Sequence, residues 1–397
     1  MQEPRIIMMF KDISQIRTDI NDIDDKLLEL LSKRTQLIFD VANFKYHNEK
    51  KVKDEAREVA HLSTLMTKAS ELGVSPKLIN EIYTAIYDDS CSKQLSYINA
   101  MRAKNNNPKS DLKVAFLGEK GTYSYLATYK YFHAYKEHIV EKNCTSFNEI
   151  VAAVENDEAD CALLPIENTS SGCINEVYDL LQDAKIKIIG ELTYPIEHCI
   201  LSKNPNIDLA NIKTVYGHAQ PISQCSTWLS NNFTDVKIVP VSSSSEAMIK
   251  AYEDTTGTVV AIGCEESGLI YKLNAIQRNI ANQKHNITRF IVVGKQEVCV
   301  PNDALAKTSI IFSTENKPGA LVNVLNVFSK HNINICKLQS RPRSPNDTKN
   351  NAIWAETFYA DIQINTNSTL MQNILKELQS FTGFVKILGC YEQNTQN

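Results

Sequence analysis

Apolar residues recur every three or four positions along the first part of the chain, at Ile13, Ile16, Ile20, Ile23, Leu27 and Leu30. This spacing predicts one face of a long helix from about Lys11 to Tyr46. The same count continues to Arg34 and Lys45, so two cations lie on the face that should be buried, about 16 Å apart along the helix axis. Because burying an unpaired charge is costly, each cation is expected to have an anionic partner.

Two more helices are predicted before about Leu95, a stretch with one glycine, Gly73, and almost no strand pattern. One runs from about Val52 to Leu72. The other begins at Ser75–Pro76, an N-cap followed by a first-turn proline, and runs past Gln94. The first helix would be about 54 Å long, and its continuous apolar face needs a cover. The N-terminal part is therefore expected to be an all-helical domain in a homodimer or a larger homo-oligomer.

The pattern changes after a polar, asparagine-rich segment at residues 99–111, which we interpret as a linker. Over residues 112–294, short β-branched runs such as "KVAFLG", "TVVAIG" and "RFIVVG" alternate with helical stretches, which predicts an open α/β sheet domain. Ligands of such sheets bind beyond the carboxyl ends of the strands. After a second linker at 295–306, the order of strands and helices predicts an α+β ferredoxin-like βαββαβ domain over 307–393. The all-helical domain is expected at 6–98. Together with the α/β domain and the βαββαβ domain, it makes the chain multidomain.

Composition and charge narrow the class of protein. The 397 residues carry a net charge of −4, which gives no reason to expect nucleic-acid or membrane binding. No apolar run is long enough for a membrane span, and the N-terminus lacks the apolar core of a secretion signal. The ten cysteines are scattered singly without a C-x-x-C pair, so neither a disulfide framework nor a zinc ribbon is expected. Reduced thiols in a cytoplasmic protein are the interpretation.

Polar residues gather on all three predicted helices of the N-terminal part. Besides the two cations of the first helix, they are Asp54, Arg57 and Glu58 on the second and Ser90 and Gln94 on the third. Each has a simpler explanation. A long cation at the edge of an apolar stripe can reach solvent, charges on one helix commonly form a solvated face, and polar residues can mark a frayed end. Together they suit a small, polyanionic, hydroxylated ligand.

The stretches "IRTDINDIDDKLLELLSKRTQLIFDVANFKY", "KDEARE" and "DDSCSKQ" resemble the all-helical chorismate mutase domain over Ile6–Gln94. The resemblance implies an intertwined dimer with a pocket of eight polar residues: Arg17, Arg34, Lys45, Asp54, Arg57, Glu58, Ser90 and Gln94. Arg17 would enter the partner's site, and Lys45 and Gln94 would contact the ether oxygen of chorismate. The rearrangement to prephenate is intramolecular and needs no proton transfer, so clamped carboxylates and donors to the ether oxygen suffice.

A hydroxyl-rich loop, "ENTSSG" at 167–172, follows the predicted strand Cys161–Pro165 and precedes a helix. A loop of this kind at a helix N-terminus is an anion site by geometry, although N-capping without a ligand explains any single serine equally well. Thr288 and Arg289 begin the strand "ITRFIVVG", for which an edge-strand pair is the simple alternative. "GEKGTYS" is not a phosphate-binding P-loop, because the terminal G-K-[ST] is missing.

The motifs "ENTSSG", "TRF" at 288–290 and "YGHAQP" at 216–221 resemble the prephenate dehydratase family, which implies a two-lobed α/β domain. "YGHAQP" departs from the family's usual Y-S-H-P-Q-P at Gly217 and Ala219. The resemblance implies that Thr288 is catalytic and donates a hydrogen bond or proton to the leaving hydroxyl, as prephenate loses CO₂ and hydroxide to give phenylpyruvate. The substrate-binding residues that it implies are Asn168, Thr169, Ser170, Ser171, Gln220, Arg289 and Phe290.

The stretch "ENKPGALVNVLNVF" within the βαββαβ order resembles an ACT regulatory domain, which implies that L-phenylalanine binds at a dimer interface. The regulatory residues that it implies are Gly319, Ala320, Leu321, Ser340, Arg341 and Pro342. Gln339 stands where the family's "ESRP" motif has a glutamate, and a neutral amide replaces a carboxylate only partly. Feedback inhibition is therefore expected in weakened form.

The sequence thus predicts a bifunctional enzyme of phenylalanine biosynthesis. It would convert chorismate to prephenate and prephenate to phenylpyruvate, without a metal or an organic cofactor. Two alternatives stay open: a chain in which one site is inactive, and a non-catalytic amino-acid sensor, since two-lobed α/β folds and ACT domains also serve in binding proteins. Arg34 and Lys45 on a buried stripe argue against the sensor, which would not need an attached mutase pocket.

Overall fold

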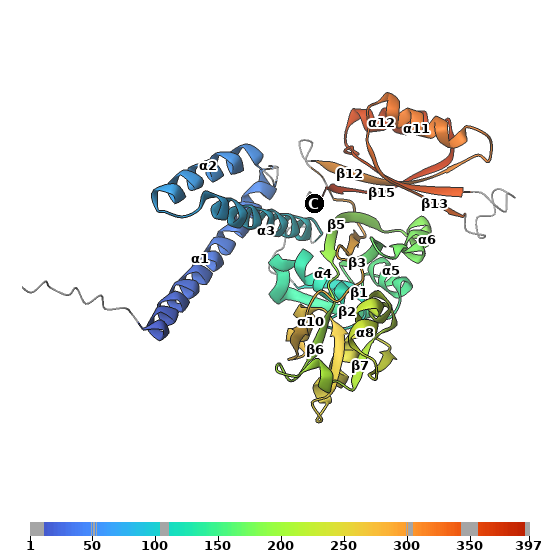
Figure 1. The fold of residues 1–397 in the computed structure, drawn as a ribbon. Coiled ribbons are helices and arrows are strands. Elements are labelled where there is room, and N and C mark those ends of the chain that lie inside the picture. Colours follow the sequence, from blue (N-terminus) through green and yellow to red (C-terminus); the bar gives the residue numbers. More distant parts are fainter. Residues whose placement is uncertain are drawn as a thin grey trace, which may run out of the picture. The chain divides into compact units, whose positions relative to one another are not determined.

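The computed structural model describes residues 12–48, 50, 52, 54–103, 111–298, 300, 305–342 and 356–393. The chain divides into two compact units, Met1–Ile98 and Asn99–Asn397. Each is described by itself, with the elements labelled in Figure 1. None of the described helices is long and apolar enough to cross a bilayer.

The first unit is made of α1 (Ile13–His47), α2 (Glu55–Glu71) and α3 (Pro76–Ala103), in the predicted order. The carboxylate of Asp54 caps α2 by accepting a hydrogen bond from the backbone N–H of Arg57 at 3.1 Å. Gly73 follows the helix with φ +72°, a left-handed conformation that glycine adopts without strain. The predicted start of the first helix at Lys11 lies outside the described residues.

Residues 99–103 of the first predicted linker, 99–111, are helical. Helix α3 continues through residues 99–103, because alanine, methionine and arginine there favour a helix over a turn. Residues 104–110 of this segment lie outside the described residues, as do 299 and 301–304 of the second predicted linker.

The N-terminal half of α1 keeps its apolar face exposed within one chain. Ile13, Leu27 and Leu30 are 60%, 52% and 61% exposed, and the buried residues of α1 are Ile38 and Ala42, both in its C-terminal half. Figure 1 shows this half of α1 extending away from α2 and α3. The stripe that predicted the helix is therefore not covered by the other two helices of the unit.

The second unit begins with a six-stranded sheet in the order β2-β1-β3-β11-β5, with β4 paired to β3. Its strands are β1 (Leu112–Leu117), β2 (Ile139–Cys144), β3 (Cys161–Asn168), β4 (Gly172–Cys173), β5 (Lys187–Pro195) and β11 (Ile287–Gly294). Its helices are α4 (Tyr123–Tyr131), η1 (His133–His138), α5 (Phe147–Glu155) and α6 (Asn175–Asp183). Strand β1 is parallel to β2 and β3, whereas β11 is antiparallel to both of its neighbours, β3 and β5.

A second sheet has the order β10-β6-β9-β7-β8 and its own cores. Its strands are β6 (Cys199–Ser202), β7 (Thr214–His218), β8 (Lys237–Val241), β9 (Val259–Gly263) and β10 (Asn274–Gln277). Its helices are η2 (Leu209–Asn211), α7 (Ala219–Gln224), α8 (Ser226–Asn232), α9 (Ser244–Glu253) and α10 (Glu265–Ile270). The chain leaves the first sheet after β5 and returns to it with β11, so the α/β region has two lobes joined by two crossings.

The C-terminal part shows the predicted βαββαβ order. Its elements are β12 (Ala306–Thr314), α11 (Ala320–Lys330), β13 (Ile335–Pro342), β14 (Glu356–Ile362), α12 (Thr369–Leu378) and β15 (Thr382–Glu392). The four strands form an antiparallel sheet in the order β13-β14-β12-β15. Both helices cover one face of this sheet (Figure 1), with Phe328 and Met371 in the core between them.

The other face of the C-terminal sheet packs on the first sheet of the α/β region. Ile311, Tyr359 and Leu388 belong to the same buried cluster as Leu164 and Ile188 of that region. Strand β15 approaches β5 so closely that a Cβ added at Gly389 would lie 2.0 Å from the backbone oxygen of Ile188. The two sheets therefore meet at a position where only glycine fits.

Replacing Gly389 by alanine is expected to lower the free energy of unfolding of the second unit by about 1–3 kcal/mol, because the methyl group overlaps backbone that cannot rotate away. Thermal unfolding followed by circular dichroism measures the loss. Gly383→Ala on the same strand is the control, since its Cβ would meet only the hydroxyl of Ser313, at 2.9 Å. A Gly389→Ala variant as stable as Gly383→Ala would contradict the close approach.

Candidate active sites

Contacts among the three helices bring most of the predicted mutase residues together. Arg34 Nη1 on α1 donates to Ser90 Oγ on α3 at 2.6 Å. Cys91 Sγ donates to Glu58 Oε1 at 3.6 Å, which joins α3 to α2. Lys45 Nζ donates to the backbone oxygen of Val52 at 2.5 Å, just before α2. The polar faces of the three helices thus meet along one seam.

Electrostatics place Lys45 within this group. Burial lowers the pKa of Lys45, while the neighbouring Cys91, Asp54 and Glu58 act to raise it and Arg57 acts to lower it. The side chain is half-buried, so the amine is partly desolvated among groups of both signs. An anionic group bound here would meet a poorly hydrated cation, which strengthens the interaction.

Gln94 lies in the same group of residues, and one of its side-chain polar atoms has no hydrogen-bond partner among the described residues. Its side chain is 7% exposed, and its Nε2 donates to Ser90 O of its own helix at 3.2 Å. Its Oε1 has no hydrogen-bond partner among the described residues. A buried acceptor without a donor is costly, so this atom is a place for a ligand's donor. Donation from Gln94 to an ether oxygen would need the amide to turn.

Arg17 lies apart from these residues within one chain. It is exposed, and it precedes Arg34 on the same helix by 17 positions, which is about 26 Å along the axis. A continuous helix cannot fold back on itself, so the predicted pocket lacks Arg17 unless another copy of the chain supplies it.

In the α/β region, Asn168 and Thr288 face each other across β3 and β11. Asn168 Nδ2 donates to Thr288 Oγ1 at 2.9 Å and to Asn286 Oδ1 at 2.7 Å. Asn168 Oδ1 accepts from the backbone N–H groups of Ser170 and Ser171 at 2.9 and 3.0 Å. These backbone donors fix which way the amide points, so Asn168 is the donor and the Thr288 oxygen the acceptor.

The other hydroxyls of the loop hold it against the segment before β11. Thr169 Oγ1 donates to His285 O at 3.1 Å and accepts from the N–H of Ile287 at 2.9 Å. Ser170 Oγ donates to Gln283 Oε1 at 2.6 Å. The Thr169 hydroxyl thus both donates and accepts within the protein, and its role as a substrate ligand stays a prediction.

Comparisons with known proteins identify two domains in the chain. The chorismate mutase type II family matches residues 16–95, and the prephenate dehydratase family matches residues 114–298. A bifunctional chorismate mutase/prephenate dehydratase of Enterobacter agglomerans is 41% identical over 378 residues, which is 95% of each chain. The one of Escherichia coli K12 is 39% identical over 376 residues, again 95% of each chain. This chain belongs to the bifunctional chorismate mutase/prephenate dehydratase family.

Solved structures support the fold of the second unit. The prephenate dehydratase of Staphylococcus aureus is 27% identical with a TM-score of 0.61, and the match covers 71% of this chain and all of that one. The prephenate dehydratase of Arthrobacter aurescens is 24% identical with a TM-score of 0.62, covering 72% of this chain and 91% of that one. The enzyme therefore joins a helical mutase region to an α/β dehydratase domain, and it acts in phenylalanine biosynthesis.

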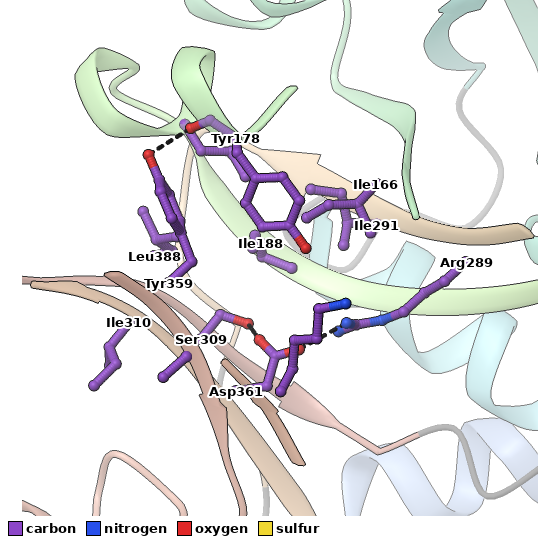
Figure 2. Close-up of a pocket in the computed structure, with 13 residues that line it drawn as sticks. Ile166, Tyr178, Ile188, Arg289, Ile291, Ser309, Ile310, Tyr359, Asp361 and Leu388 are labelled. Atoms are coloured by element: carbon purple, nitrogen blue, oxygen red, sulfur yellow. Dashed lines mark hydrogen bonds and ion pairs between the residues drawn. The ribbon is translucent and has the colours of Figure 1, made fainter. Parts of the chain in front are cut away.

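Arg289 lies among carboxylates of the protein, and its predicted role as a cation near the substrate stays a prediction. Successive side chains of a strand point to opposite faces, so Arg289 points away from the Thr288 side. Its guanidinium forms ion pairs with Glu167 at 3.1 Å, Glu191 at 2.9 Å and Asp361 at 2.7 Å, between the two packed sheets. Figure 2 shows Arg289 and Asp361 among the residues that line a small cavity between the sheets.

Phe290 and Gln220 also differ from the expectation. Phe290 is 2% exposed and packs in the core of the first sheet with residues such as Leu192, so it supports the strand from within. Gln220 is exposed on α7 in the second lobe, and its backbone N–H donates to His218 Nδ1 at 3.4 Å. No described contact joins Gln220 to the Asn168–Thr288 pair.

A chain of hydrogen bonds beside the site was missed at the sequence level. Tyr123 Oη donates to Glu197 O at 2.7 Å and lies 3.1 Å from His198 Nδ1, whose other nitrogen, Nε2, lies 2.7 Å from Gln224 Oε1. Tyr123 also packs on Tyr194, the strand partner of Thr288. Tyr123 belongs to the "GEKGTYS" stretch, in which no site residue is predicted from the sequence.

The predicted regulatory residues fall on two elements of the C-terminal sheet. Gly319, with φ +80°, is the N-cap of α11, and Ala320 and Leu321 follow it. Strand β13 carries the other three, and Arg341 forms an ion pair with Asp179 of α6 through contacts of 2.9 and 2.6 Å. This guanidinium therefore faces the dehydratase domain, and no described contact joins the two groups of predicted residues.

The rate of the mutase reaction is expected to fall with rising pH below the ordinary lysine pKa of 10.5, because burial lowers the pKa of Lys45 and the neutral amine cannot stabilise the ether oxygen. The measurement is kcat/KM for chorismate against pH, which reports groups of the free enzyme. Lys45→Arg should shift this fall to higher pH, since a guanidinium stays protonated. Lys33→Arg, at an exposed position of the same helix, should leave the profile in place. An unchanged profile in Lys45→Arg would show that another group titrates.

Proposed function

We propose that the residues gathered in each unit carry one of the enzyme's two reactions. The observation that supports this best is that each unit holds its own cluster, around Lys45 in the helices and around Thr288 in the α/β region. The mutase cluster offers cations and an unmet acceptor, and the dehydratase cluster offers an oriented hydroxyl. These are the groups that a charge-stabilised rearrangement and an assisted elimination each need.

In the mutase pocket, Arg34 and Lys45 bind the dianion chorismate and hold it in the chair-like conformation that reacts. Negative charge develops on the ether oxygen as its bond to carbon breaks, and Lys45 donates to that oxygen. Glu58 and Asp54 take the substrate hydroxyl or fix the neighbouring cations. Donors held in place before the reaction contribute about 3 kcal/mol each to such a transition state.

The pocket is completed by Arg17 of the partner subunit in a homodimer. Two features of one chain support this proposal: the exposed apolar stripe of α1, with Ile20 51% and Ile23 57% exposed, and the length of helix between Arg17 and Arg34. A second copy that packs along α1 would cover the stripe and bring its own Arg17 toward the pocket. The free energy for assembly would come from burying these side chains, each contributing about 1.5–3 kcal/mol.

In the dehydratase site, Thr288 donates its hydroxyl proton toward the leaving hydroxyl of prephenate. Asn168 already donates to Thr288 Oγ1, so the proton of Thr288 is turned toward the ligand side, and no described residue accepts it. The C–C bond to the ring carboxylate breaks, its electrons complete the aromatic ring, and the C–O bond breaks with the oxygen leaving as hydroxide or water. The products are phenylpyruvate and CO₂.

The C-terminal domain acts as an ACT sensor of L-phenylalanine. Its βαββαβ order and its glycine-capped α11 fit this role. The dehydratase of Arthrobacter aurescens was solved in complex with L-Phe. Gln339 in place of the motif's glutamate weakens the response. Effector binding inhibits only as far as it favours a less active arrangement.

We place the three domains at 6–98, 112–294 and 307–393. A reducing, cytoplasmic environment fits the nine described cysteines, which carry free thiols. The proposed partners are the two substrates, L-phenylalanine as effector and a second copy of the chain.

A paired assay tests whether each cluster carries one of the two reactions. Purified wild type, Lys45→Ala and Thr288→Ala are each given chorismate in one arm and prephenate in the other. Lys45→Ala should lose about 100-fold or more in the mutase rate alone, and Thr288→Ala a similar factor in the dehydratase rate alone. L-phenylalanine added to the prephenate arm should slow wild type. Wild type that converts chorismate but leaves prephenate untouched would overturn the dehydratase proposal.

Subunit mixing tests the shared mutase pocket. Arg17→Ala and Lys45→Ala should each be nearly inactive, but a mixture allowed to exchange subunits should recover about a quarter of wild-type activity, since half of the dimers then hold one intact site of two. The measurement is the mutase rate after dissociation and reassembly, with each variant alone as the control. If heterodimers form but no mutase activity is recovered, Arg17 acts in the pocket of its own chain or in neither pocket.

A further inference from the structure

Two polar side chains continue the faces of α2 and α3 that carry the mutase cluster by one more helical turn. His61 lies three positions after Glu58 on α2, and Tyr87 lies three positions before Ser90 on α3. Residues three or four positions apart on a helix are neighbours on its surface, so His61 shares a face with Glu58 and Tyr87 shares a face with Ser90. Neither residue is among the eight pocket residues that the family resemblance implies.

Contacts between α2 and α3 make His61 and Tyr87 the next pair along the seam. Cys91 Sγ of α3 donates to Glu58 Oε1 of α2 at 3.6 Å, and one turn further on Tyr87 Oη lies 2.8 Å from His61 Nδ1. The residue numbers rise along one helix as they fall along the other, which is the pattern of two antiparallel neighbours. The His61–Tyr87 pair therefore borders the group of residues that holds the proposed mutase pocket.

The phenol of Tyr87 lies near the charges of this pocket. Arg34 donates to Ser90 Oγ at 2.6 Å, and Tyr87 is one turn before Ser90 on the same helix. Burial raises the pKa of Tyr87, the nearby charge of Arg34 acts to lower it, and the charge of Glu58 acts to raise it. The phenol is thus protonated at neutral pH and can donate a hydrogen bond beside Arg34.

Three rings hold this phenol in place. The ring centroids of His61 and Tyr87 are 6.2 Å apart, those of His61 and Tyr83 are 6.3 Å apart, and those of Tyr83 and Tyr87 are 6.0 Å apart. The role of His61 Nδ1 toward Tyr87 Oη depends on the tautomer of the imidazole. When Nδ1 carries the proton, it donates to the phenol oxygen, and the phenol's own proton can then point to a ligand.

We propose that Tyr87, oriented by His61, is a further substrate-binding residue of the mutase pocket and donates a hydrogen bond to the carboxylate of chorismate that Arg34 binds. A carboxylate has about four acceptor positions, so a guanidinium and a phenol can bind the same one. This inference rests on the mutase pocket proposed above. It differs from a purely structural role, in which the His61–Tyr87 contact only joins α2 to α3.

The test compares Tyr87→Phe with Tyr83→Phe in the full-length enzyme, by initial rates of chorismate loss. Each change removes one hydroxyl from the same cluster of rings, but Tyr83 lies one turn further from Ser90. Tyr87→Phe should raise KM for chorismate about 10-fold or more and change kcat by less than about twofold, because a carboxylate keeps its charge during the rearrangement and is bound equally before and in the transition state. Tyr83→Phe should keep both constants within about twofold of wild type.

Two changes at His61 test whether the imidazole orients the phenol. The amide Nδ2 of an asparagine can donate from about the place of the ring Nδ1, whereas a leucine fills the space without a donor. His61→Leu should raise KM by about three- to tenfold and His61→Asn by less. His61→Leu combined with Tyr87→Phe should be little worse than Tyr87→Phe alone, because one residue acts through the other. Equal losses in His61→Asn and His61→Leu, or additive losses in the double variant, would overturn the proposal.

The outcomes of Tyr87→Phe are distinct. A wild-type KM would overturn the proposal, and so would a fall in kcat with KM unchanged, which would place the hydroxyl at the breaking bond instead of at a carboxylate. A KM raised equally in Tyr87→Phe and Tyr83→Phe would mean that the rings only pack. Thermal unfolding and the dehydratase rate report intact protein in each variant.

Lys45→Ala in the paired assay above separates this failure from failure of the proposed function. It tests the mutase pocket without changing Tyr87 or His61. If Lys45→Ala loses the mutase rate while Tyr87→Phe keeps the KM of wild type, the proposed pocket stands and the further inference fails. If Lys45→Ala keeps the mutase rate, the proposed pocket itself fails.

Discussion

The charge of Arg289 lies between two sheets, out of water, and the arrangement of the second unit depends on how that charge is compensated. Burying a cation without partners would cost more free energy than most packing contacts contribute. Three carboxylates meet it, two from neighbouring strands of its own sheet and one from the C-terminal sheet. The carboxylates are balanced in turn by Lys307 and Lys337. The apolar contacts around this network then hold the two sheets face to face.

Several contacts of other kinds reinforce the same junction. Lys386 donates to the last carbonyl groups of α6, which a helix leaves unpaired, at 3.2, 2.9 and 2.8 Å. Gly389 lets strand β15 approach the backbone of Ile188. Tyr359 adds a buried ring and a hydrogen bond to α6. Because these contacts are spread over β14, β15 and α6, the C-terminal sheet and the dehydratase sheet share one core, and a change in one is felt in the other.

The helical unit solves the problem of buried cations in a different way. Arg34 and Lys45 are only half-buried, and their partners within the chain are a hydroxyl and a backbone carbonyl, which are neutral. Asp54 and Glu58 lie near Lys45, but Arg57 offsets them. Their positive charges are therefore not fully compensated by acidic groups of the same unit, whereas Arg289 of the second unit is paired with three carboxylates.

The sequence by itself determined the helices of the first unit, the alternating strands and helices of the α/β region and the βαββαβ order. Each follows from local periodicity and from residues that end helices or strands. The motifs also singled out Thr288 and Asn168, whose side chains are in contact, since a strand end and a hydroxyl-rich loop are short-range features. Tertiary structure decided what is non-local. Strand β11 inserts antiparallel between β3 and β5, more than ninety positions after β5 begins, and this pairing turns Arg289 to the face of the sheet opposite Thr288. The partnership of Arg289 with Asp361, and the glycine at 389, depend on two sheets meeting, which no window of sequence contains.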